Sequence, residues 1–117
     1  MNKEVFKNIN INGINYKLKL VAQSNPELGK NNRGITDFEQ LKILLGKNYA
    51  PDLRVKTFYH ELAHALCEST SFNNELIERF SNIEFECFID QLGEAIQLFI
   101  QNNDYKDIEN FVRNDER

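Results

Sequence analysis

Residues 57–66, TFYHELAHAL, form the segment on which the fold and function of the whole chain depend. In a helix, His60 and His64 lie four positions apart, about one turn, on the same face. Two imidazoles placed in this way can bind one zinc ion, and Glu61 can then reach a water molecule at the metal's open position. The segment therefore has the His-Glu-x-x-His pattern of a zinc metallopeptidase helix.

The alternative interpretation is that both histidines are ordinary structural residues, since short motifs also occur by chance. The neighbouring positions Phe58, Leu62 and Ala63 are apolar, however, and polar groups in such a helix lose free energy unless they find partners. The chain contains only two histidines, and both fall inside the motif. The pattern therefore favours metal binding over a structural role.

Length and composition indicate one small globular domain, residues 1–117. The hydrophobic fraction of 41% and charged fraction of 27% are ordinary for such a domain. A net charge of −4 gives no basic surface for nucleic acid, so we expect no nucleic-acid partner. No apolar run approaches the roughly 20 residues that span a membrane, and the first residues do not resemble a signal peptide. We therefore expect a cytoplasmic protein without a membrane partner.

The chain contains two cysteines, Cys67 and Cys87. In a protein without an export signal they are expected to be reduced, and free cysteines tend to be buried. We therefore predict that both fill the core. Cys67 comes three residues after His64, so a contact with the metal is a second possibility for this thiol.

The first half of the chain predicts two β-hairpins. Residues 5–11 and 14–21 alternate between apolar and polar positions around Asn12-Gly13, a favoured two-residue turn. A loop rich in turn-forming residues follows at 22–33. Residues 34–38 and 41–45 predict two more strands, because one hairpin alone makes a marginal sheet. A helix over 36–45, capped by Thr36 and Glu39, is the competing prediction.

The second half predicts helices. The motif helix begins at Pro51 and ends near Glu68, and residues 69–74 interrupt it before a short helix at 74–80. A helix at 83–101 carries an apolar stripe at three- and four-residue spacing. Its members are Phe85, Phe88, Ile89, Leu92, Ile96 and Phe99. The polar tail 105–117 contains Ile108, Phe111 and Val112, which could dock as one more helical turn.

These elements together predict an α+β fold. A small antiparallel sheet, made of the N-terminal hairpin and the second short hairpin, packs on the motif helix and the C-terminal helix in a zincin-like arrangement.

A catalytic zinc site needs a third protein ligand, which must be Asp, Glu or Cys because no third histidine exists. The HExxHxxGxxH class is thereby excluded. Helix 83–101 supplies Glu84, Glu86, Asp90 and Glu94. On a helical wheel Glu84 and Glu86 flank the apolar stripe, whereas Asp90 and Glu94 lie toward the polar side. Glu84 and Glu86 are therefore favoured, although any of these acids could instead be a solvated surface residue.

Residues 56–66, KTFYHELAHAL, resemble the small phage- and prophage-encoded metallopeptidase-like proteins, which are similar to the ImmA/IrrE group of zinc metallopeptidases. Thr57 matches a threonine three residues before the family motif. Residues 86–93, ECFIDQLG, resemble the downstream segment whose early glutamate is the third zinc ligand, but Ile89 replaces a residue that is often small. The resemblance covers roughly residues 6–102 and is specific only at the motif helix. It implies Zn²⁺ as cofactor and Glu86 as third ligand, with Glu84 and Asp90 as alternatives.

The resemblance implies a gluzincin-type peptidase that cleaves a specific protein partner, such as a phage repressor. Glu61 would be the general base, and zinc would polarise the scissile carbonyl. Tyr59, Tyr105 and Arg79 are candidates for a second electrophile, but each is as readily a packing or surface residue. An exposed edge strand within 34–45 could hold a peptide by strand addition.

Two other functions fit the same sequence. One is a catalytically inactive zinc-binding protein that acts by protein–protein interaction, as an antirepressor or a phage accessory factor. The other is a metal-free structural domain in which the motif arose by chance. The retained Glu61 favours hydrolysis, since a zinc-binding scaffold needs no general base. The sequence gives no indication of the oligomeric state.

Overall fold

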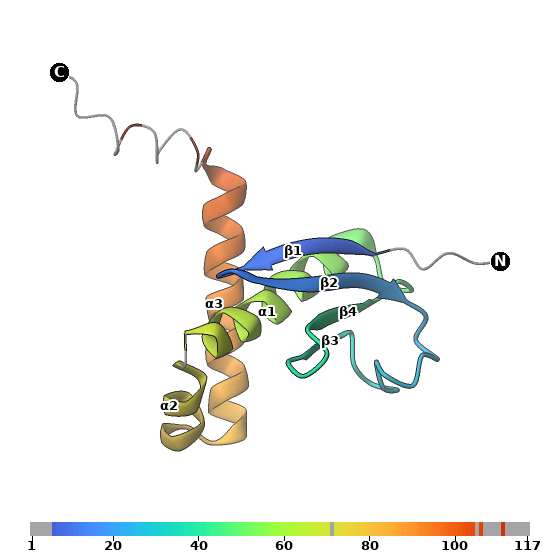
Figure 1. Cartoon of the computed structure of the whole chain (residues 1–117), viewed down its shortest axis with the longest axis horizontal. Coiled ribbons are helices and arrows are strands. Elements are labelled where there is room, and N and C mark those ends of the chain that lie inside the picture. The colour runs from blue at the N-terminus through green and yellow to red at the C-terminus, as the bar shows by residue number, and fades with distance from the viewer. Residues whose placement is uncertain (1–5, 71, 105, 107–110, 112–117) are drawn as a thin grey trace.

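A computed structural model describes residues 6–70, 72–104, 106 and 111. In this part of the chain four strands precede three helices, so the predicted α+β class is confirmed (Figure 1). The elements in chain order are β1 (Lys7–Ile11), β2 (Ile14–Val21), β3 (Gly34–Asp37), β4 (Lys42–Gly46), α1 (Pro51–Ser69), α2 (Phe72–Arg79) and α3 (Asn82–Asn102). None of the described helices is both long and apolar enough to cross a membrane.

Both predicted hairpins are present. β1 and β2 pair in antiparallel fashion around Asn12 and Gly13, whose φ angles of 51° and 89° suit a two-residue turn. β3 and β4 also pair in antiparallel fashion, so residues 36–45 do not form the alternative helix.

The prediction of an antiparallel sheet is wrong, because the sheet is mixed. Its strand order is β1-β2-β4-β3, and the two central strands β2 and β4 run parallel, from Lys17 opposite Lys42 to Val21 opposite Gly46. After β2 the chain passes through the loop and forms β3 at the edge of the sheet. It then turns back as β4, which lies between β2 and β3. β4 is therefore central, and all its residues are buried.

The core has two parts, which meet at α1. One lies between the sheet and α1 and is built around Ile43, Leu45 and Ala65, all nearly inaccessible to solvent. The other lies among the three helices and contains Ala63, Cys67, Leu76 and Ile89. α1 thus contributes alanines to both sides, and these small side chains allow the sheet and α3 to approach it closely.

One cysteine prediction is confirmed and the other is wrong. Cys67 is buried, and burial raises the pKa of its thiol. Cys87 is exposed because it lies two positions, about 200° around the helix, from Phe85, which packs against the helical core.

The predicted helices of the second half are present with small shifts at their ends. The short helix is Phe72–Arg79, and the apolar stripe of α3 packs at Phe85, Phe88, Ile89 and Leu92. At Phe99 the stripe prediction is wrong, since 52% of this residue is exposed. Figure 1 shows the reason, because the last turns of α3 extend beyond α1.

Most of the 105–117 tail, for which docking is predicted, lies outside the described residues. Phe111 is 70% exposed, and Ile108 and Val112 lie outside the described residues.

Gly93 marks the place where α3 crosses α1. A Cβ atom added there would lie 2.8 Å from the Tyr59 carbonyl oxygen and 3.0 Å from His60 Cα. Both are backbone atoms, which cannot rotate away. The two helices therefore touch backbone to backbone beside the first histidine of the motif.

Gly93→Ala is expected to reduce the free energy of unfolding by about 1–3 kcal/mol, because the methyl group overpacks this crossing. Helix propensity alone predicts the opposite sign, since alanine favours a helix by about 1 kcal/mol over glycine. Urea unfolding followed by circular dichroism measures the difference. Gln91→Ala, at an exposed position of the same helix, is the matched control and should change little. A stabilised Gly93→Ala protein would contradict the close crossing.

Candidate metal centre

α1 presents the two motif histidines on one face, as the helical spacing predicts. The centres of the His60 and His64 rings are 5.1 Å apart, and the side chains are 22% and 16% exposed. Each ring is thus held by the protein while keeping access to the surface. One turn earlier, the Thr57 hydroxyl donates a hydrogen bond to the Leu53 carbonyl oxygen at 2.8 Å.

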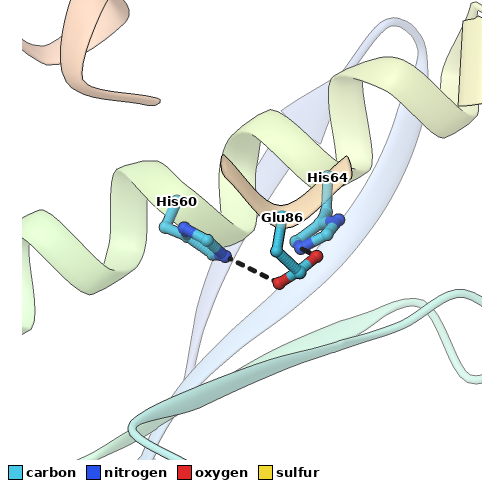
Figure 2. Close-up of side chains that lie close together, drawn as sticks. All are labelled: His60, His64 and Glu86. Carbon is cyan, nitrogen blue, oxygen red and sulfur yellow. Dashed lines mark ion pairs between the residues drawn. The ribbon is translucent and has the colours of Figure 1, made fainter. Parts of the chain in front are cut away.

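Glu86 of α3 lies opposite both histidines (Figure 2). Its Oε1 atom is 3.4 Å from His60 Nε2, and its Oε2 atom is 3.2 Å from His64 Nε2. Ligand atoms bound to one tetrahedral zinc ion at about 2.0–2.1 Å lie about 3.3 Å from one another. One ligand atom from each of the three side chains lies within 4.8 Å of the others, so the group could hold a metal ion, and Glu86, 54% exposed, leaves the site open on one side.

The other acidic candidates of α3 are not part of this group. Glu84 caps its own helix, because Ser81 Oγ accepts from the Glu84 N–H at 3.2 Å and the Ser81 N–H donates to Glu84 Oε1 at 3.0 Å. These hydrogen bonds lower the pKa of the Glu84 carboxyl. Glu94 is exposed, and Cys67 is buried in the helical core. Among the described residues, the only group with metal-binding geometry is the one containing Glu86.

Asp90 holds the other nitrogen of His60. Its Oδ1 atom lies 3.4 Å from His60 Nδ1, while Nε2 of the same ring faces Glu86. A carboxylate in this position fixes the ring orientation and the tautomer that leaves Nε2 free for a metal. Asp90 is therefore placed to orient a ligand and not to be one. It shares a face with Glu86 because it follows one helical turn later.

Asp90→Ala is expected to weaken zinc binding by about 10- to 100-fold, the usual cost of losing a partner behind a metal-binding histidine. Competition with a chromophoric chelator measures the affinity. Glu94→Ala, one turn further along α3, removes the same charge without touching His60 and should leave the affinity unchanged. Equal affinities for both variants would contradict an orienting role for Asp90.

Glu61 is buried next to the histidines, with 7% of the residue exposed. The Thr36 hydroxyl of β3 donates to Glu61 Oε1 at 2.8 Å and also lies 3.1 Å from the Glu61 carbonyl oxygen. Burial raises the pKa of the Glu61 carboxyl, while the hydrogen bond from Thr36 and the two histidines oppose this rise. The carboxyl group is thus held in one orientation and binds a proton more readily than a solvated glutamate.

β3 reaches α1 because Gly34 has no side chain. A Cβ atom there would lie 2.7 Å from Thr57 Cγ2 and 3.1 Å from Glu61 Cγ. The sequence alone did not identify Gly34 or Thr36 as part of the site. No local pattern gives this information, because it depends on which strand lies over the helix.

Two clefts open on either side of the three-residue group, and both include Gly34, Glu61 and Glu86 in their walls. The first, of about 370 Å³, has a polar wall and contains His60. The second, of about 410 Å³, has a more apolar wall and contains His64. Neither wall includes Tyr59 or Arg79, and Tyr105 lies outside the described residues, so no second electrophile is assigned.

The geometry can be set beside known proteins. No known protein family, curated protein or solved structure matches the chain. The resemblance to the ImmA/IrrE group therefore rests on the motif residues and remains a prediction. The features of the site that bear on function are the three convergent side chains and the buried carboxyl group of Glu61 beside them.

Proposed function

We propose that the protein is a zinc-dependent peptidase that hydrolyses a peptide bond in a specific protein partner. One observation carries the proposal, namely that Glu86 meets His60 and His64 at zinc-ligand spacing while Glu61 is buried beside them. When bound, zinc supplies a Lewis acid that lowers the pKa of water toward ~7 and polarises a carbonyl group.

Glu61 is the general base in this proposal. Its carboxylate takes a proton from the attacking water and then delivers it to the leaving amine. Both steps need a carboxylate held beside the metal-binding group, and the buried position of Glu61 next to His60 and His64 suits this requirement. Thr36 keeps the carboxyl group in place through its hydrogen bond at 2.8 Å.

β3 is suited to hold the substrate in an extended form. Among the described strands it pairs with β4 alone. The Gly46 N–H donates to the Arg33 carbonyl oxygen at 2.8 Å, so the backbone polar groups of Arg33 face β4. Alternation along the strand turns the N–H and C=O groups of Gly34 and Thr36 toward the free edge. A peptide added there would pass directly over Glu61.

The proposal is tested by incubating the zinc-loaded protein with a diverse mixture of synthetic peptides. Mass spectrometry identifies newly formed termini. New termini that disappear when zinc is chelated, and return when zinc is restored, would support hydrolysis. A zinc-loaded protein that produces none would favour the second function.

That second function is a zinc-binding protein that acts by contact with a partner. It is favoured by large apolar side chains on the outer surface of the helices, where Ile83 is 78% exposed and Leu98 and Phe99 are 50% and 52% exposed. Scattered apolar residues are common on surfaces, so this observation is weaker than the arrangement around Glu61. The peptide assay separates the two functions.

A further inference from the structure

The two clefts beside the metal-binding group differ in their chemistry, and this difference bears on the substrate. Resting on the proposed function, we propose that the substrate is an extended peptide with an acidic side chain on the His60 side of the scissile bond. We also infer a large apolar side chain on the His64 side. Both preferences are inferred from the difference in composition between the walls of the two clefts.

The His60 side contains two cationic side chains, Arg33 and Lys56. Neither forms an ion pair with the other described residues. Arg33 is anchored through its carbonyl oxygen to Gly46, so its position at the start of β3 is fixed while its side chain is exposed. Asn31 and Asn32 add amide groups to the same wall. These groups suit a carboxylate.

The acidic residues of this cleft leave a net positive charge only when a metal ion is bound. Glu61 accepts from Thr36, Glu86 faces both histidines, and Asp90 faces His60. Without a metal the three carboxylates outnumber the two cations, but a bound dication makes the balance positive. A substrate carboxylate would therefore be attracted once zinc is present.

The His64 side has a more apolar wall than the His60 side. Phe85 lies with its ring centre 5.7 Å from that of His64, and Ile35, Phe38 and Ile77 add apolar side chains, beside the polar Thr36 and Asn73. Its only charged residues are Glu61 and Glu86, which both clefts share. An aliphatic or aromatic side chain would bury apolar area here, whereas an acidic side chain would meet Glu61 and Glu86 with no cationic side chain in this wall.

The strand β3 connects the two sides. Arg33 precedes the strand and lines the first cleft, while Phe38 follows the strand and lines the second. A peptide paired along the free edge of β3 would therefore run from the cationic wall to the apolar wall. The substrate peptide bond between the residues with the acidic and the apolar side chain would then lie above Glu61.

The test measures peptide binding, so it does not depend on turnover. Zinc-loaded Glu61→Gln protein is titrated into fluorescent peptides that differ only at one position, with glutamate, glutamine or lysine there, and anisotropy reports the affinity. A second series exchanges leucine for serine at each other position in turn. We expect glutamate to bind about tenfold more tightly than lysine, because two exposed ion pairs contribute about 1.4 kcal/mol.

Variants locate the preference. Arg33→Gln combined with Lys56→Gln should abolish the preference for glutamate, and 0.5 M salt should reduce it in the parent protein. Lys7→Gln on β1, at the opposite edge of the sheet, removes a charge far from the cleft and should preserve it. Ile77→Ser, at a position 60% exposed, should reduce the preference for leucine without disturbing the core. The two single variants replace the double variant if circular dichroism shows that it is misfolded.

The outcomes distinguish this inference from the proposed function. Selective binding without cleavage by the wild type would support the inference and contradict the peptidase. Cleavage without any preference for glutamate would overturn the inference and leave the peptidase in place. Failure of every peptide to bind, or a preference that survives in the double variant, would also overturn it.

Discussion

Glu61→Gln is expected to bind zinc as the wild type does and to hydrolyse peptides about a thousandfold more slowly. Glutamine has the same shape and can still accept the hydrogen bond from Thr36, but it cannot take a proton from water. The measurement pairs the zinc content of the purified protein with initial rates on a peptide that the wild type cleaves. A variant that keeps most of the rate would remove Glu61 from the mechanism.

The same substitution is also expected to change the thermal stability of the metal-free protein, which can be measured without any turnover. Because burial raises the pKa of Glu61, the folded state binds its proton more tightly than the unfolded state does. Stability is therefore lost as the pH rises from about 4.3, the ordinary glutamate value, through the raised pKa. Metal-free Glu61→Gln should melt above metal-free wild type at pH 7. Glu78→Gln, an exposed substitution on α2, should not.

Glu86→Gln should lose zinc, with an affinity at least about 100-fold below that of the wild type. The variant keeps the shape of the side chain but removes the charge of the proposed third ligand. A direct ligand should contribute at least as much as an orienting partner, for which 10- to 100-fold losses are usual. Metal analysis after dialysis against a weak chelator should find about one zinc per wild-type chain and almost none in the variant.

Glu84→Gln is the matched comparison, since it removes the same charge from the same helix two residues earlier. It weakens the cap made with Ser81, so it should lower thermal stability modestly and leave zinc binding intact. Zinc retained by Glu86→Gln and lost by Glu84→Gln would reverse our assignment. Loss in both variants would instead point to a general disturbance of α3.

The histidine pair could be predicted from sequence because helical periodicity alone sets its geometry. The choice of Glu86 over Glu84 could not be made in this way. The two residues lie about 200° apart on the helix, and both flank the apolar stripe. Which flank faces α1 depends on how the helices cross at Gly93. The helical wheel likewise puts Asp90 toward the polar side, because it does not show which flank faces α1. In the structure Asp90 shares a face with Glu86.

The sheet, too, can be predicted only in part from the sequence. Each hairpin is predicted by local alternation and turn chemistry, whereas the parallel pairing of β2 with β4 joins segments separated by a loop and another strand. β3, which pairs with β4, brings Thr36 to Glu61, and Arg33 before it lines the first cleft. Local sequence patterns therefore predict the motif itself, but they cannot predict which residues surround it.

The location of the ligands on both sides of α2 has a consequence for the folding of the chain. A metal ion held by His64 and Glu86 ties two points of the backbone together and encloses α2 in a closed loop. In chain-entropy terms, a permanent cross-link over about 20 residues stabilises a protein by about 3 kcal/mol. Bound zinc would act as a reversible cross-link. The supply of zinc would therefore also affect how long α2 and α3 stay docked against α1.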